Sequence, residues 1–303
     1  MIRVNPKVDL AFKKLFGVEE NKDLLISLIN SIVSEEDQVK DVILLNPHNP
    51  QNFKNDKLSI LDIKAEGHNK KKFNIEIQIT DSADYDKRAL YYWARLYAEQ
   101  LASGEEYSKL NKAIGIHILN FTSILESEKY HNTFHLTEKD TGIQHFKDIE
   151  LHAIELTKFS QGLDDDFHQL LSKMKQTIDI WAAFLTKYDL LDQKQNELPE
   201  APDFSNLKKA LNIINVMNFS DEERNSYEDH LKWLRDETSA LNKKYEKGKA
   251  EGKAEGLAEG REEGIKKTAL KMLRKKMDID TISEITELSV DEIKKLETEN
   301  QKY

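Results

Sequence analysis

The chain has 303 residues, of which 39% are hydrophobic and 33% are charged, which predicts a folded protein with a heavily charged surface and one large or two modest domains. The net charge of −10 argues against a protein that coats nucleic acid with its whole surface, although it permits a local basic groove. The absence of cysteine excludes disulfides, thiolate metal sites and cysteine nucleophiles.

We expect a cytoplasmic protein without a membrane anchor. The first residues lack the apolar run of a signal peptide, and no stretch approaches the ~20 apolar residues that a membrane span requires. A chain without cysteine also suits a reducing compartment.

The first 80 residues predict helices followed by a strand-rich stretch. Apolar residues at helical spacing indicate two helices, near 12–16 and 24–32. Apolar runs then predict three strands, over 39–45, 58–66 and 73–80. Gly67-His68-Asn69 is typical of a turn, so the second and third strands are expected to form a hairpin.

A third helix and two further strands follow the hairpin. Leu90, Ala94, Tyr97 and Leu101 recur on one helical face, and Gly104 lies just past the expected end of the helix. Strands are expected over 114–121 and 149–156. The order predicts an α/β fold, with a mixed sheet flanked by helices.

The second half of the chain predicts helices throughout. One apolar stripe covers 167–185 and another covers 207–217. Ser220 and Glu223 match a capping box, so a long helix is expected to begin there. Residues 279–296 indicate two short helices with the outline of a helix-turn-helix, although Asp291, Glu292 and Glu297 are unusual in a helix that reads DNA.

A glycine repeat lies between these helical regions. Five of the eleven glycines, from Gly248 to Gly264, are spaced four residues apart. Each costs about 1 kcal/mol of helix stability relative to alanine, so a lone helix here is marginal. The segment is either a charged linker or a helix for self-association, which makes a homo-oligomer through residues 246–276 conceivable. Its locally basic charge also suits contact with the DNA backbone.

Together these patterns divide the chain into four parts. We expect an α/β core over 1–160, a helical extension over 161–240, the glycine-repeat helix or linker over 241–278, and a small helical pair over 279–303.

Two carboxylates are the main candidates for chemistry. Phe73 to Thr80 alternates strictly between apolar and polar residues, which puts Glu76 on the polar face, and Asp62 lies on the matching face of the preceding strand. If the strands pair through the Gly67 turn, the two side chains lie within about 5–8 Å of each other. Two such carboxylates suit Mg²⁺, which keeps several waters and can activate one of them. The same alternation also marks an ordinary hairpin with one wet face.

The chain resembles the recombination-promoting nuclease and transposase family of the PD-(D/E)XK nucleases. The resemblance runs nearly end to end and is strongest over residues 1–160. It rests on Asn5 to Gly17, Leu61 to Ala65, Asn74 to Gln78, Arg88 to Tyr107, and the late Glu-Gly repeat.

The resemblance implies a restriction-endonuclease-like core and metal-dependent cleavage of double-stranded DNA, linked to recombination or transposition. Asp62 and Glu76 would bind the metal, Mg²⁺ or Mn²⁺, and Asp9 on the first helix matches an acidic position of the opening motif. Asp9 is equally typical of a surface residue near a helix N-terminus. Gln78 stands where the wider superfamily has lysine; it can orient water but supplies no positive charge. We expect Lys64, beside Asp62, to supply that charge.

Other residues have weaker assignments. Arg88, Tyr92 and Arg95 are expected on the helix face opposite Leu90, where they can meet DNA phosphate or simply face solvent. His117 lies in a strand and is expected to be structural. The alternative function is a weak or silent DNA-associated assembly protein, motivated by Gln78 and the negative net charge.

Overall fold

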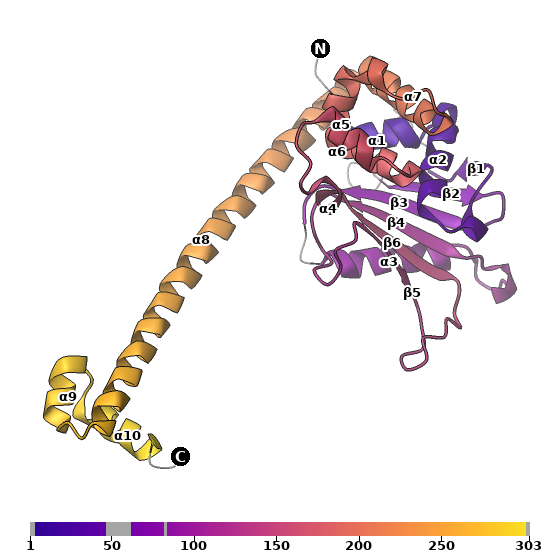
Figure 1. Cartoon of the computed structure of the whole chain (residues 1–303). Helices are drawn as coiled ribbons and strands as arrows, with labels where there is room; N and C mark the ends of the chain where they lie inside the picture. The colour runs from indigo at the N-terminus through magenta and orange to yellow at the C-terminus, as the bar shows by residue number, and fades with distance from the viewer. Residues whose placement is uncertain (1–3, 47–61, 82–83, 301–303) are drawn as a thin grey trace. The chain divides into compact units, whose positions relative to one another are not determined.

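The computed structural model describes residues 4–46, 62–81 and 84–300, and it separates into two compact units, 1–235 and 236–303. The first unit contains a six-stranded mixed sheet in the order β1-β2-β3-β4-β6-β5 (Figure 1). Its strands are β1 (Val42–Leu44), β2 (Ile63–Gly67), β3 (Lys72–Gln78), β4 (Ala113–Leu119), β5 (His131–His135) and β6 (Ile149–Glu155).

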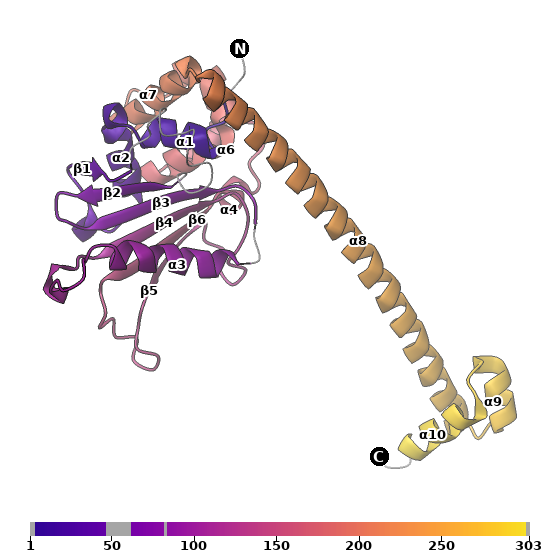
Figure 2. The same ribbon diagram turned by 180° about the vertical axis from the view of Figure 1, so that it is seen from behind.

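Helices flank the sheet and continue beyond it. They are α1 (Asp9–Phe16), α2 (Lys22–Ile32), α3 (Tyr85–Ala98), α4 (Leu156–Ser160), α5 (Phe167–Lys173), α6 (Thr177–Gln193), α7 (Pro202–Val216), α8 (Asp221–Arg274), α9 (Ile279–Thr286) and α10 (Val290–Asn300). Helices α1, α2 and α6 lie on one side of the sheet and α3 lies on the other (Figures 1 and 2). The restriction-endonuclease-like α/β fold expected from the sequence is confirmed.

The expected hairpin of β2 and β3 is present and antiparallel, with Ile63 opposite Ile75. Lys70 in the turn has a positive φ of 64°, a conformation that a short turn requires. Beyond the hairpin, β3 pairs with β4 and β4 with β6 in parallel, so Glu76 and His117 are register partners. The expected strand over 58–66 is described only from residue 62 onward; its first half lies outside the described residues.

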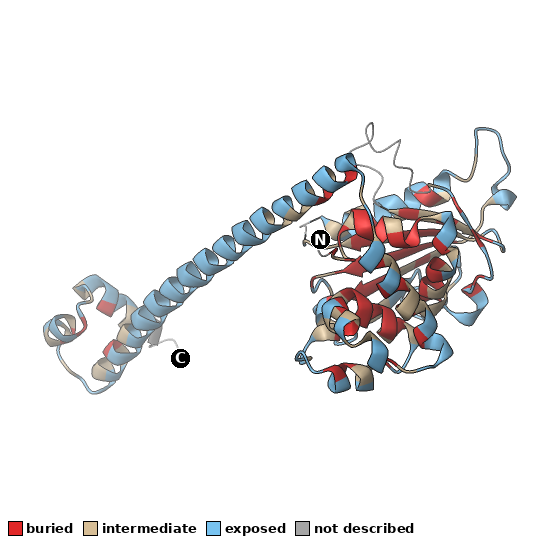
Figure 3. Ribbon diagram, turned by 90° about the horizontal axis from the view of Figure 1, so that it is seen from above, coloured by how far each residue is buried: buried red, intermediate tan, exposed pale blue. Residues whose placement is uncertain are grey.

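One large hydrophobic core joins the sheet to the helices of the first unit. The apolar side of the sheet, with Ile75, Ile116 and Ile154, packs in the same cluster as Trp181 of α6 and Leu211 of α7. Figure 3 shows the buried residues concentrated in the sheet and these helices, whereas most of α8 is exposed. Helices α5, α6 and α7 therefore complete the core that the sheet begins.

The orientation of α3 differs from the expected one. Ala89 and Leu96 are its buried residues, whereas Leu90 is 51% exposed and Leu101 lies beyond the end of the helix. The face of α3 toward the sheet instead carries Ala89 and Leu96, together with Tyr85, whose ring meets His117 edge to face. Tyr85, Ala89 and Leu96 form an alternative helical stripe that the sequence pattern also allows.

Strand β5 was not predicted from the sequence. The sequence of β5, His-Asn-Thr-Phe-His, is polar because β5 is an exposed edge strand beside β6. The apolar stripe expected over 167–185 is divided between two helices, α5 and α6, and the division has a local cause. Asp166 caps α5, and Gln176 with Asp179 forms a capping box at the start of α6.

The second unit contains most of α8 and the helical pair α9 and α10. Ala269, Ile282 and Ile293 form its small buried core. Asp278 caps α9, and Ser289 with Glu292 forms a reciprocal cap before α10. The two short helices expected near the C-terminus are therefore present.

Candidate active site

The hairpin brings Asp62 and Glu76 to the polar side of the sheet. Continuing the register one step beyond Ile63 and Ile75 places Asp62 opposite Glu76. Burial raises the pKa of both carboxyls, and the charge of Asp62 raises the pKa of Glu76 further. Two carboxylates that are half-buried and repel each other are suited to bind a cation.

Asp9 lies near the same carboxylates, at the first residue of α1. Its pKa is raised to about 7, first by burial and then by the charge of Glu76. His230, in the first turns of α8, places Nε2 3.9 Å from Asp9 Oδ2. The acidic residue that the sequence placed on the first helix is thus an electrostatic neighbour of Glu76.

Gln78 and Arg88 meet on the same side of the sheet. Arg88 Nη2 donates to Gln78 Oε1 at 2.8 Å and lies 3.4 Å from Glu76 Oε1. Arg88 extends from the first turn of α3, and its side chain is 43% exposed. Arg88 was expected opposite Leu90, facing DNA phosphate or solvent. Because Leu90 is the exposed residue, the guanidinium of Arg88 instead reaches Glu76.

The other predicted site residues take different positions. Lys64 Nζ lies 3.2 Å from Glu99 Oε2, and Arg95 contacts the same carboxylate. Lys64 lowers the pKa of Asp62 through space but is paired with the end of α3. Tyr92 is 37% exposed on α3. Contact of Arg88, Tyr92 or Arg95 with DNA stays a prediction.

Lys13 and His117 belong to this region although sequence reasoning did not select them for it. Lys13 on α1 is 2% exposed, and its Nζ donates to the Asp62 carbonyl oxygen at 3.2 Å. Burial lowers its pKa to about 8 against the opposing effect of Asp62. The sequence did contain a signal for Lys13, because it lies on the apolar face of a short amphipathic helix. Buried lysines are rare unless they are paired, so such a position indicates a nearby partner.

His117 is buried beside Glu76, with Nδ1 3.8 Å from Glu76 Oε2. Burial, followed by the charges of Arg88 and His152, lowers the pKa of His117 to about 4, so the ring is neutral at pH 7. Within the described part of the chain neither ring nitrogen has a hydrogen-bond partner. Such buried, unpaired polar groups are uncommon and concentrate at functional sites.

The donor set suits a hard divalent cation in its chemistry. Asp62 and Glu76 supply carboxylate oxygens, the ligands that Mg²⁺ prefers, and Mg²⁺ commonly takes only one or two carboxylates and keeps its waters. Among the residues the structure describes, no group of three or more His, Cys, Asp or Glu side chains is arranged to hold a metal ion.

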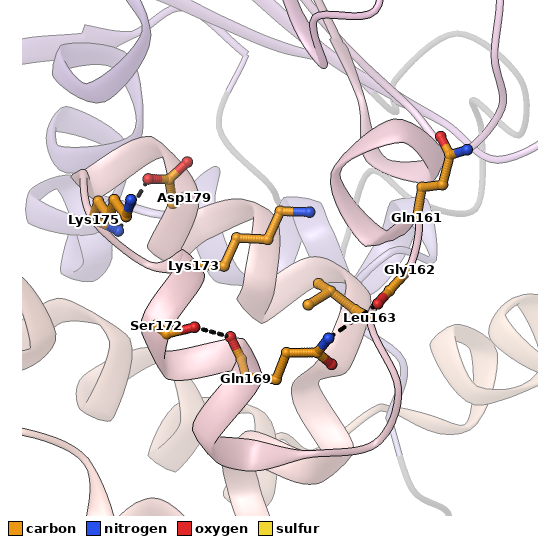
Figure 4. A pocket seen from close by; sticks show the side chains of 8 residues that line it. All are labelled: Gln161, Gly162, Leu163, Gln169, Ser172, Lys173, Lys175 and Asp179. Carbon is orange, nitrogen blue, oxygen red and sulfur yellow. Dashed lines mark hydrogen bonds between the residues drawn. The ribbon is translucent and has the colours of Figure 1, made fainter.

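A separate hollow of about 470 Å³ lies among residues of α5, α6 and the segment before α5 (Figure 4). Its polar groups already serve the local structure. Gln169 Nε2 donates to the Gly162 carbonyl oxygen, and Asp179 accepts from the backbone of Lys175 and Gln176. The hollow includes none of the carboxylates of the hairpin, so it is not the candidate active site.

The sheet and its flanking helices form a restriction-endonuclease-like α/β fold. A family model described as PD-(D/E)XK nuclease family transposase matches residues 6–244, and the chain belongs to this family. A second model, the C-terminal helix-turn-helix domain of the Rpn/YhgA-like nuclease family, matches residues 262–298. No curated protein and no solved structure gave a significant match.

The second match clarifies the C-terminal helical pair. The acidic residues of α10 argued against DNA reading, whereas the match places α9 and α10 in a helix-turn-helix domain of a nuclease family. In the described residues no helix is long and apolar enough to cross a membrane.

Proposed function

We propose that this protein is a divalent-metal-dependent endonuclease that hydrolyses phosphodiester bonds of double-stranded DNA during recombination or transposition. The observation that carries the proposal is the pairing of Asp62 and Glu76 across the β2–β3 hairpin, where burial and mutual repulsion raise the pKa of Glu76. PD-(D/E)XK nucleases typically use divalent metals. By the resemblance of the sequence to that signature, Asp62 and Glu76 are the residues that would bind one.

Asp62 and Glu76 would hold Mg²⁺ or Mn²⁺. A bound ion would lower the pKa of a coordinated water and offset charge on the scissile phosphate. Asp9, an electrostatic neighbour of Glu76, adds negative potential that favours a cation at the site. Gln78, two residues after Glu76 on the same face of β3, can hydrogen-bond water or a phosphate oxygen.

Recognition of DNA is divided between the two units in this proposal. The helix-turn-helix domain of residues 262–298 binds the duplex, and the first unit cuts it. Arg95 and Tyr92, both exposed on α3, are candidate contacts to the DNA backbone.

The test is cleavage of supercoiled plasmid by the purified protein in Mg²⁺, in Mn²⁺ and in EDTA. Glu76→Gln removes one carboxylate, and we expect at least a ~100-fold loss of cleavage, since a metal supplies several kcal/mol of charge stabilisation. Glu66→Gln is the matched control, because Glu66 also lies on β2–β3 but pairs with Lys70 and Lys72. Equal cleavage by Glu76→Gln and wild type would refute the site.

The alternative function is a silent assembly or tethering protein that uses α8. A Cβ added at any glycine from Gly248 to Gly264 meets nothing within 4 Å among the described atoms, so this face of the helix is open to a partner. Wild-type protein that binds DNA and forms oligomers, yet never cuts in Mg²⁺ or Mn²⁺, would favour this alternative.

A further inference from the structure

Arg88 forms a bridge between the two polar side chains of β3. Its Nη2 donates to Gln78 Oε1 at 2.8 Å and approaches Glu76 Oε1 at 3.4 Å. Arg88 Nε is itself buried and has no hydrogen-bond partner in the described part of the structure. Among the described residues, Nη2 is therefore the nitrogen that ties the guanidinium to Glu76 and Gln78 of β3.

The chemistry of arginine determines how Gln78 is oriented. A guanidinium has only hydrogen-bond donors, so the Gln78 side chain must direct its oxygen toward Arg88. The amide nitrogen of Gln78, with two further donors, then points away from Arg88. The pair presents one positive charge and several hydrogen-bond donors, as a lysine ammonium would at this position, while the Gln78 oxygen is engaged by Arg88.

The other cations near the carboxylates have different partners. Lys64 pairs with Glu99, and Lys13 donates to the backbone oxygen of Asp62. Arg88 is the cation with a direct contact to both Glu76 and Gln78 within the described residues. Its charge also lowers the pKa of Glu76, which opposes the effect of burial.

We propose that Arg88 is a positioning residue for cleavage, and that Arg88 and Gln78 together replace the lysine of the Asp…Glu-x-Lys signature. This inference rests on the proposed nuclease function and reassigns to Arg88 the charge that the sequence led us to expect from Lys64. Arg88 holds the Gln78 amide oxygen, which leaves the amide nitrogen to meet the substrate, and its positive charge partly offsets the negative charge of Glu76. An arginine stays protonated at every working pH, so it orients and stabilises but does not accept a proton.

The same contacts imply opposite effects on metal binding and on cleavage. Arg88 and a metal ion compete for the negative charge of Glu76. Arg88→Met should therefore tighten Ca²⁺ binding, by up to about fivefold on the scale of a partly exposed ion pair. The same variant should cut plasmid DNA about 100-fold more slowly, the effect of removing one preorganised donor.

The experiment compares wild type with Arg88→Met, Arg88→Lys and the double variant Gln78→Lys/Arg88→Met. Ca²⁺ affinity is measured by calorimetry at pH 8, and cleavage is measured with Mg²⁺ at saturating protein. Lys87→Met is the control, because Lys87 carries the same charge on the same helix and pairs with Asp84. The double variant should recover most of the cleavage, since its new lysine restores charge and donors at one position.

The outcomes separate this proposal from the proposed function. If wild type cuts and Arg88→Met cuts equally well, the role of Arg88 is refuted and the nuclease function stands. If Arg88→Met loses cleavage with weakened Ca²⁺ binding and the double variant recovers nothing, Arg88 is merely structural, which also overturns the proposal. If wild type neither binds Ca²⁺ nor cuts, the nuclease function itself fails.

Discussion

His117 and Glu76 are neighbours in parallel register on β4 and β3, and His117 Nδ1 lies 3.8 Å from Glu76 Oε2. The ring is neutral and buried, and the described residues supply no hydrogen bond to either nitrogen. A buried polar group without a partner costs about 1–3 kcal/mol. The unpaired imidazole beside a candidate metal ligand therefore lowers the stability of the surrounding core.

Replacing His117 tests this relationship. His117→Leu should raise the free energy of unfolding by about 1 kcal/mol, because an apolar side chain of similar size removes two unpaired nitrogens. It should also slow plasmid cleavage, because the neighbour of Glu76 has changed. Urea unfolding and cleavage assays measure the two effects, with His168→Leu on the exposed first turn of α5 as the control. Lower stability in His117→Leu would show that the ring is well satisfied in the folded protein.

A second prediction concerns the buried cluster formed by Asp37, Lys71, Lys112 and Glu150. Asp37 is 1% exposed, and its oxygens accept from Lys71 Nζ at 2.5 Å and Lys112 Nζ at 2.7 Å. Lys112 also lies 2.8 Å from Glu150 Oε2. Asp37→Asn leaves two partly buried ammonium groups undercompensated next to a buried side chain and should cost about 3–5 kcal/mol. Asp23→Asn, which breaks the exposed pair with Lys209, should cost less than about 1 kcal/mol.

The same cluster predicts how stability depends on pH. Burial alone raises the pKa of Asp37, but hydrogen bonds from Lys112, Lys71 and Ser34 outweigh it and hold the pKa below its usual value. A carboxyl with a lowered folded pKa stabilises the protein above the unfolded pKa of about 3.9, and the stabilisation is lost as the pH falls through the folded pKa. Urea midpoints below pH 4 should therefore fall more steeply for wild type than for Asp37→Asn. If the urea midpoints of wild type and Asp37→Asn fall in parallel with pH, the lowered pKa of Asp37 is contradicted.

A third prediction concerns Tyr227, which anchors the start of α8 in the first unit. Tyr227 is 1% exposed, stacks on Phe219, and accepts the backbone N–H of Asn5 at 2.8 Å. Tyr227→Ala should cost about 3–5 kcal/mol and Tyr227→Phe about 1 kcal/mol, since the first loses the ring and the second only the hydroxyl. Thermal unfolding measures both. Tyr245→Ala, at an exposed position of the same helix, should change stability by less than about 0.5 kcal/mol.

A fourth prediction concerns the glycines of α8. Gly252 and Gly256 lie within the helix, and an added methyl group meets nothing within 4 Å among described atoms. Each Gly→Ala change should favour the helix by about 1 kcal/mol, which circular dichroism detects as a higher melting temperature of the helical signal. Sedimentation of Gly252→Leu/Gly256→Leu tests self-association through residues 246–276. If the double variant sediments as a species as heavy as wild type, the glycine face takes no part in self-association.

Much of the fold was predictable because its signals are local. Strict alternation from Phe73 to Thr80 predicted a half-buried strand, and the Gly67 turn predicted its hairpin partner. Ser220 and Glu223 predicted the start of α8, where each side chain accepts from the backbone N–H of the other. Alternation and capping depend on residues a few positions apart, so the sequence displays them directly.

Long-range packing decided the surroundings of the carboxylates. The sequence by itself placed Asp62 and Glu76 on one polar face, because hairpin register follows from the turn and the alternation. It did not determine which face of α3 meets the sheet, since two helical stripes were available. Only the tertiary structure directs Arg88 to Gln78 and Lys64 to Glu99, because those contacts join separate elements whose packing no local pattern records.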